Sequence, residues 1–113
     1  MLKQTLLLVL LSSTAVPAAG ADVAVNLTGI GSKTCAYWLS GQSHQSEGVV
    51  WIYGFWSGLN YVAAASEQDQ SKATGTAMVA AVDRLCRREP SRVLAAAAWS
   101  AYVDLQEKNK QEK

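Results

Sequence analysis

The most regular hydrophobic pattern of the chain lies in residues 47–67. Apolar side chains recur there at three- and four-residue steps, which is the spacing of one helical face: Trp51, Phe55, Leu59 and Val62. Further apolar residues stand between them, and residues 48–66 carry no charge. A helix that is apolar nearly all round is either buried inside a protein or spans a membrane.

The uncharged segment has about the length of a membrane span, so both alternatives have to be weighed. A span would place Cys35 and Cys86 on opposite sides of the bilayer, where they could not form a disulfide. Three glycines and Asn60 also lower its hydropathy. We therefore expect a central, buried helix with no stable membrane insertion. Gly54 and Gly58 lie on one face of it, and their missing side chains would let another helix approach closely.

A shorter helix is predicted before the long one. Residues 33–40 carry apolar side chains at helical spacing, and Gly41 ends this segment. Residues 42–46 are polar and are expected to form a loop. Ser43 or Ser46 would then cap the long helix, because a serine hydroxyl accepts hydrogen bonds from the free N–H groups of a helix start.

Two more helices are predicted after the long one. The third covers about residues 74–88 and ends before Pro90, because proline disfavours a helical conformation in the residue before it. The fourth covers residues 93–105, and Ser91 is expected to cap it. Together, residues 33–106 are expected to form a small, single-domain, all-α bundle of about four helices.

The two ends of the chain differ from this domain. Residues 1–21 combine a positive start, an apolar run over residues 5–11 and a small-residue site at Ala19-Gly20-Ala21, which together indicate a cleaved signal peptide. Residues 22–32 are expected to form an N-terminal arm, and the charged residues 107–113 a frayed tail. The protein is therefore expected to be exported to the bacterial periplasm.

Two cysteines fall in the part that would remain after cleavage, which has about 90 residues. A domain of that size buries a limited fraction of its surface and gains from a covalent link. In an oxidising compartment, Cys35 and Cys86 are expected to form a structural disulfide. Closing a loop of about 50 residues contributes roughly 4 kcal/mol in a chain-entropy model. The alternative is a pair of free or catalytic thiols, but the chain has no Cys-x-x-Cys motif.

Several function classes lack the residues that they need. The formal net charge is +1, and acidic residues interrupt the arginines of residues 84–92, so no clustered basic face for nucleic acid is expected. His44 is the only histidine, which leaves no catalytic triad and no tetrahedral metal site. The sequence has no glycine-rich loop of the kind that binds phosphate. We expect no enzyme, no metal and no cofactor.

A set of motifs resembles a known family. Cys35 lies in a short helix, Trp51-Ile52-Tyr53-Gly54-Phe55 lies in a long one, and Cys86-Arg87-Arg88-Glu89-Pro90 closes a third. With the signal peptide, this pattern resembles the HdeA/HdeB family of periplasmic acid-stress chaperones over roughly residues 34–105. The resemblance implies a compact helical domain with one disulfide, usually dimeric near neutral pH. It also implies that acid exposes apolar surface that holds unfolding client proteins.

The sequence therefore favours a protein that binds other proteins. Aromatic residues are enriched at protein interfaces, and the candidates for client or dimer contact on the long helix are Trp51, Tyr53, Phe55, Trp56 and Leu59. Trp56 and Tyr53 are the residues that we expect to be exposed, whereas Trp51 and Phe55 are expected in the core. An immunity or inhibitor protein for one secreted toxin or hydrolase is the alternative, and an accessory of an envelope machine is a third.

Overall fold

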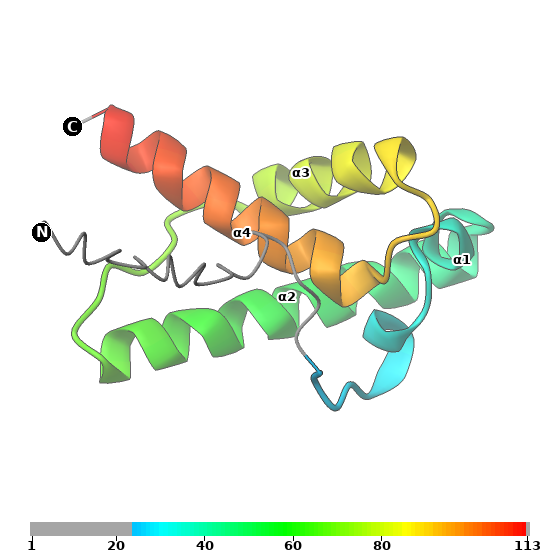
Figure 1. Cartoon of the computed structure of the whole chain (residues 1–113), viewed down its shortest axis with the longest axis horizontal. Coiled ribbons are helices and arrows are strands. Elements are labelled where there is room, and N and C mark those ends of the chain that lie inside the picture. The colour runs from blue at the N-terminus through cyan, green and yellow to red at the C-terminus, as the bar shows by residue number, and fades with distance from the viewer. Residues whose placement is uncertain (1–23, 113) are drawn as a thin grey trace, which may run out of the picture.

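The computed structural model describes residues 24–112, so the predicted signal peptide, residues 1–21, lies outside the described part. Four α-helices and one short 3-10 helix follow one another in this part (Figure 1): η1 (Gly29–Ser32), α1 (Cys35–Leu39), α2 (Gln42–Ala65), α3 (Gly75–Arg88) and α4 (Leu94–Gln111). Residues 24–112 form no β-strand apart from one isolated bridge between Thr34 and Val93. The predicted all-α fold with one disulfide is confirmed.

Threonine hydroxyls start two of the helices. The Thr34 hydroxyl accepts a hydrogen bond from the backbone N–H of Tyr37 at 3.1 Å, at the start of α1. The Thr74 hydroxyl accepts one from the N–H of Ala77 at 3.2 Å, at the start of α3. Each bond satisfies one of the donors that a helix start leaves without an internal partner.

The serine caps that the sequence suggested for the other two helices are wrong. Residues 42–46 belong to α2, whose N-cap is Gly41, so the predicted polar loop is absent and Ser43 and Ser46 lie inside the helix. The N-cap of α4 is Val93, and Ser91 makes no cap. The N–H of Leu94 instead donates to the carbonyl of Lys33 at 2.8 Å.

The far end of α4 also differs from the prediction. The helix continues to Gln111, although the sequence pattern placed its end near Leu105. Lys108 and Lys110 lie in its last turn, where positive charge interacts favourably with the negative end of the helix dipole. The polar residues 107–111, which suggested a tail, therefore continue the helix and are all exposed.

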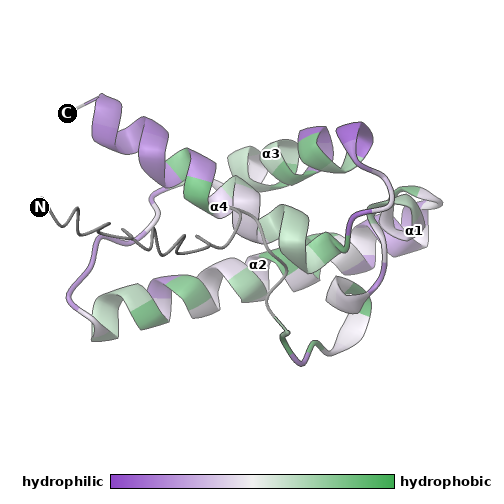
Figure 2. Cartoon of the chain, in the orientation of Figure 1, coloured by the Kyte–Doolittle hydropathy of each residue, from purple (hydrophilic) through white to green (hydrophobic). Residues whose placement is uncertain are grey.

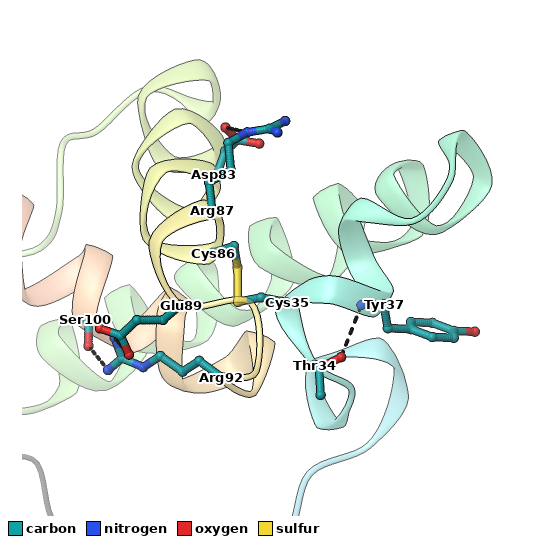
Figure 3. The surroundings of a disulfide bond; sticks show 9 residues. All are labelled: Thr34, Cys35, Tyr37, Asp83, Cys86, Arg87, Glu89, Arg92 and Ser100. Carbon is teal, nitrogen blue, oxygen red and sulfur yellow. Dashed lines mark hydrogen bonds and ion pairs between the residues drawn. A yellow bond between two sulfur atoms is a disulfide. The ribbon is translucent and has the colours of Figure 1, made fainter.

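The disulfide joins α1 to the end of α3 and lies in the core (Figure 3). Backbone hydrogen bonds reinforce the same junction. The N–H of Cys35 donates to the carbonyl of Arg92 at 2.7 Å, and the N–H of Ala36 donates to the carbonyl of Pro90 at 2.8 Å. Because Leu94 donates in return to Lys33, the starts of α1 and α4 satisfy each other's free backbone groups.

A single apolar core lies where the helices meet. Alanines contribute much of the buried surface of α4, and small side chains let its backbone approach its neighbours closely. The largest fully buried side chains and the disulfide lie in this core: Trp56, Ile52, Leu94, Val82, Cys35 and Cys86.

Candidate protein-binding surface

The buried side of α2 is not the side that the sequence pattern selected. Ile52, Trp56 and Ala63 are its buried apolar residues. Trp56, which we expected to be exposed or in a dimer contact, is 0% exposed, so that expectation is wrong. Its indole N–H donates to the hydroxyl of Ser71 at 2.9 Å. Tyr53 is 43% exposed, as expected, and Leu59 is half-buried.

Trp51 and Phe55 lie on the flank of α2 and are half-buried, with their rings stacked 5.1 Å apart. The N-terminal arm covers this flank. The indole N–H of Trp51 donates to the carbonyl of Thr28 at 2.9 Å, and Ile30 reaches the core. Trp51 thus belongs to the packing of η1 against α2, and Phe55 stacks on it.

The close helix approach predicted at Gly54 and Gly58 is wrong. A methyl group added at either position would meet no atom within 4 Å. Close approach occurs instead at other glycines, most tightly at Gly31 and Gly48. An added Cβ would lie 2.0 Å from the Trp51 ring at Gly31, and 2.2 Å from the Trp38 ring at Gly48.

The two open glycines belong to an exposed strip along α2. Its members recur four, seven, eight and eleven residues after the first, which places them on one side of the helix: Val50, Gly54, Ser57, Gly58 and Tyr61. We call this strip the α2 face. Val50 is 71% exposed and Tyr61 is 78% exposed. Exposed Tyr53 and Val62 flank the strip on either side, so α2 is a half-exposed helix and not the fully buried one that we expected.

The α2 face is uncharged, and its two large side chains, Val50 and Tyr61, are hydrophobic. No charged residue occurs between Glu47 and Glu67, so the whole exposed strip lacks charge. Figure 2 shows green turns alternating with pale and purple ones along α2, in contrast to the continuously hydrophilic end of α4. None of the helices within residues 24–112 is long and apolar enough to cross a membrane. Contiguous exposed apolar surface in a protein commonly marks a site where another molecule binds.

A groove lies beside the α2 face, between α1, α2 and α3. It measures about 610 Å³ and has mostly apolar walls, with polar groups at its edge. Its lining residues are Trp38, Leu39, Gln45, Val49, Tyr53, Thr76, Val79, Ala80, Asp83 and Arg84. Tyr53 lines the groove and flanks the α2 face, so the two surfaces are continuous. We call it the Tyr53 groove.

A second groove of about 370 Å³ runs between α3 and α4. Its sides are charged, with Arg84 and Arg88 on α3, and Asp104 and Lys108 on α4. The floor includes small apolar side chains such as Ala81. Because this second groove carries charges of both signs, it favours neither an anionic nor a cationic ligand.

The connection after α2 is held by a polar cluster that was not predicted. The side-chain amide of Asn60 donates to the carbonyl of Ser71 at 3.2 Å and accepts from its N–H at 2.8 Å. Ser71 is buried, and its hydroxyl also accepts from the Trp56 indole. Serine and asparagine are common surface residues, so only the fold reveals that these two lie together.

The arginines near the end of α3 differ in their partners. Arg87 donates to the carboxylate of Asp83 at 2.8 Å, and this hydrogen bond, together with the opposite charge, raises the pKa of Arg87 above its usual value. Arg92 donates to the hydroxyl of Ser100 at 2.6 Å (Figure 3). Arg84 makes no ion pair within 4 Å to any residue of the described part.

His44 occupies a local arrangement at the start of α2. Its ring stacks on Tyr37 at 4.1 Å, and its Nδ1 lies 2.9 Å from the hydroxyl of Ser40. That hydroxyl also donates to the carbonyl of Tyr37 at 2.6 Å. Within residues 24–112, no group of three or more histidine, cysteine or acidic side chains could hold a metal ion.

Comparisons with protein-family models, with curated proteins and with solved structures give no match to this chain.

Proposed function

We propose that this chain is an exported, periplasmic binding protein that holds unfolding client proteins on the α2 face, as a holdase chaperone does. The observation that carries the proposal is the exposed, uncharged strip from Val50 to Tyr61, in which these two large hydrophobic side chains are mostly exposed. Removing apolar surface from water is favourable by roughly 25 cal/mol per Å². Covering such a strip with apolar segments of an unfolding protein would therefore stabilise the complex.

The lack of charge on the α2 face supports a broad client range over a single dedicated partner. Specific inhibitors use complementary charges to select one partner and to fix its orientation. The strip between Glu47 and Glu67 contains no charged residue. Apolar contact alone discriminates poorly between partners, which suits a protein that holds many different clients.

The disulfide between Cys35 and Cys86 supports export, because such bonds persist in oxidising compartments. The role in acid stress comes from the resemblance to the HdeA/HdeB family and belongs to the proposal. The α2 face is exposed in the folded chain, so client binding by this face does not require prior unfolding. We therefore propose that some holding activity exists at neutral pH, with acid increasing it.

The test is suppression of aggregation. Citrate synthase and rhodanese are diluted from guanidinium chloride at pH 7, and light scattering is followed with and without the oxidised protein. Acid-induced aggregation of the same clients is followed at pH 3. We expect reduced scattering with both clients, and loss of the effect when Val50→Asp and Tyr61→Asp are combined. Both positions are exposed, so the fold should tolerate the change.

Val25→Asp is the matched control, because Val25 is also an exposed valine but lies on the N-terminal arm. Unchanged scattering with the wild-type protein at both pH values would refute the holdase proposal. Tight binding of one secreted toxin or hydrolase without such breadth would support the inhibitor alternative. Sedimentation equilibrium of the same variants tests whether a second copy of the chain covers the α2 face.

A further inference from the structure

The Tyr53 groove combines apolar walls with one positive charge that has no partner. Trp38 and Leu39 of α1, Val49 of α2 and Val79 of α3 supply apolar wall surface. Its volume of about 610 Å³ lies within the range of natural ligand sites, which are mostly apolar with a few polar groups that orient the ligand. A groove of this kind can take apolar side chains of a bound segment.

The two charged residues that line this groove differ in their ion-pair partners. Asp83 and Arg84 both line it. The Asp83 carboxylate already forms an ion pair with Arg87 at 2.8 Å. Arg84 has no ion-pair partner within the described part, so its guanidinium remains available to a carboxylate of a bound molecule.

We propose that the Tyr53 groove binds client segments in which an apolar side chain is followed closely by Asp or Glu. The apolar side chain would lie against Val49 and Val79, and the carboxylate would pair with Arg84. This inference rests on the proposed function and specifies the client sequences. The groove continues through Tyr53 into the α2 face, so one client chain can contact both surfaces.

One exposed guanidinium favours this occupant over others. Binding of nucleic acid depends on several cations along a phosphate backbone. Membrane-surface helices carry several lysines or arginines on their polar face, whereas the residues that flank the uncharged part of α2 are Glu47 and Glu67. A bound segment with one carboxylate next to apolar side chains matches the single positive charge of Arg84.

The test compares three fluorescein-labelled peptides on the oxidised, full-length mature protein. They share one apolar sequence of leucine, phenylalanine and serine, and carry Glu, Gln or Lys after the phenylalanine. Fluorescence polarisation at pH 7 and low salt should show the Glu peptide binding about threefold more tightly than the Gln peptide, which corresponds to an exposed ion pair. The Lys peptide should bind least well. High salt should reduce the difference.

Variants of α3 test which residue causes the preference for the Glu peptide. Arg84→Gln should make the Glu and Gln peptides bind equally. Arg88→Gln is the matched control and should keep the preference, because Arg88 is exposed on the same helix but lines only the other groove. Ala80→Trp, which would fill the Tyr53 groove, should weaken all three peptides, with circular dichroism as the check of folding.

The outcomes separate this inference from the proposed function. Equal binding of the Glu and Gln peptides, or no peptide binding at all, would overturn the inference. So would an equal loss of preference in Arg84→Gln and Arg88→Gln. If aggregation is still suppressed in those cases, the holdase proposal is supported and only the groove inference is refuted. A preference for Glu that depends on Arg84, found without any suppression of aggregation, would support the groove and refute the holdase role.

Discussion

At the scale of single residues, the glycines of this chain occupy two opposite environments. Gly58 lies in the middle of α2 with no atom near the position of a Cβ, whereas Gly31 leaves no room beside Trp51. Glycine inside a helix costs roughly 0.5–1 kcal/mol relative to alanine when nothing requires the missing side chain.

We therefore predict that Gly58→Ala raises the free energy of unfolding by roughly 0.5–1 kcal/mol. Gly31→Ala should lower it, because the new methyl group would overlap the Trp51 ring. Denaturant unfolding followed by circular dichroism measures both changes. If Gly58→Ala destabilised the protein, and did so more at high protein concentration, a partner would be covering the α2 face in solution.

Glu67 occupies a backbone conformation that favours glycine. Its φ angle is 56°, in the left-handed region, just after the end of α2. The N–H of Gln68 donates to the carbonyl of Ala63, and the N–H of Glu67 donates to that of Ala64, which is the Schellman arrangement. Left-handed geometry costs a residue with a Cβ roughly 1–2 kcal/mol.

We predict that Glu67→Gly stabilises the fold by up to about 1 kcal/mol, since the relieved strain exceeds the added freedom of the unfolded chain. Ala64→Gly is the control within the same helix end. It should cost about 1 kcal/mol, because Ala64 has ordinary helical geometry. Thermal unfolding monitored by circular dichroism compares the two variants. A loss of stability in both would contradict the role of the left-handed turn.

The cysteines and the glycines show what the sequence could indicate about single residues. Two cysteines leave one possible pairing, so the disulfide between Cys35 and Cys86 was predictable. Glycines carry no such restriction. A glycine in a helix is compatible with close packing or with open solvent, and only the positions of the neighbouring helices distinguish Gly54 from Gly48.

At the scale of elements, α2 illustrates why a helix can be predicted when its orientation cannot. Its length and apolar character indicate a helix near the core. Predicting which side faces the core requires a contrast between an apolar and a polar side of the helix. α2 shows little contrast of this kind, because residues 48–66 carry no charge on any side. The pattern selected the side of Trp51 and Phe55, but Ile52 and Trp56 face the core.

The connection between α2 and α3 depends on a buried polar cluster. The Ser71 hydroxyl accepts hydrogen bonds from the Trp56 indole and from the backbone N–H of Ala73 at 3.3 Å. Ser71→Ala would leave the buried indole N–H without a partner, which costs roughly 1–3 kcal/mol. We predict a loss of stability of that size in denaturant unfolding, with altered tryptophan fluorescence in the folded state.

Ser57→Ala is the matched control for that change. The Ser57 hydroxyl donates to the carbonyl of Tyr53 at 2.8 Å on the exposed side of α2, where water can replace the bond. Its loss should change stability by less than about 0.5 kcal/mol. Equal effects of the two substitutions would mean that the cluster around Ser71 does not hold the connection in place.

At the scale of the whole molecule, apolar packing, one covalent link and backbone hydrogen bonds join the helices, and the ion pairs between residues 24–112 contribute little to this. The three ion pairs of the described part each join residues three or four positions apart: Asp83 with Arg87, Glu89 with Arg92, and Glu107 with Lys110. None of them links two helices. Protonating their carboxylates in acid therefore removes local contacts without separating one helix from another.

The disulfide should therefore decide how the protein responds to acid. Its loss costs about 4 kcal/mol in the chain-entropy model for a separation of 51 residues. That is a large part of the roughly 5–15 kcal/mol that stabilises a typical domain. In acid, protonated carboxylates leave the lysines and arginines unopposed, and their mutual repulsion favours expansion. Loss of the disulfide alone, or acid alone, should leave the helical bundle folded. Loss of the disulfide in acid should unfold it.

We predict that the oxidised protein keeps its far-ultraviolet helical signal at pH 3, and that the Cys35→Ala, Cys86→Ala double variant loses most of it. At pH 7 the double variant should remain helical but unfold at a lower denaturant concentration. An oxidised protein that loses its helical signal at pH 3 would contradict this account. The packing between helices would then depend on carboxylate charge, and client binding in acid would involve an unfolded chain instead of the exposed α2 face.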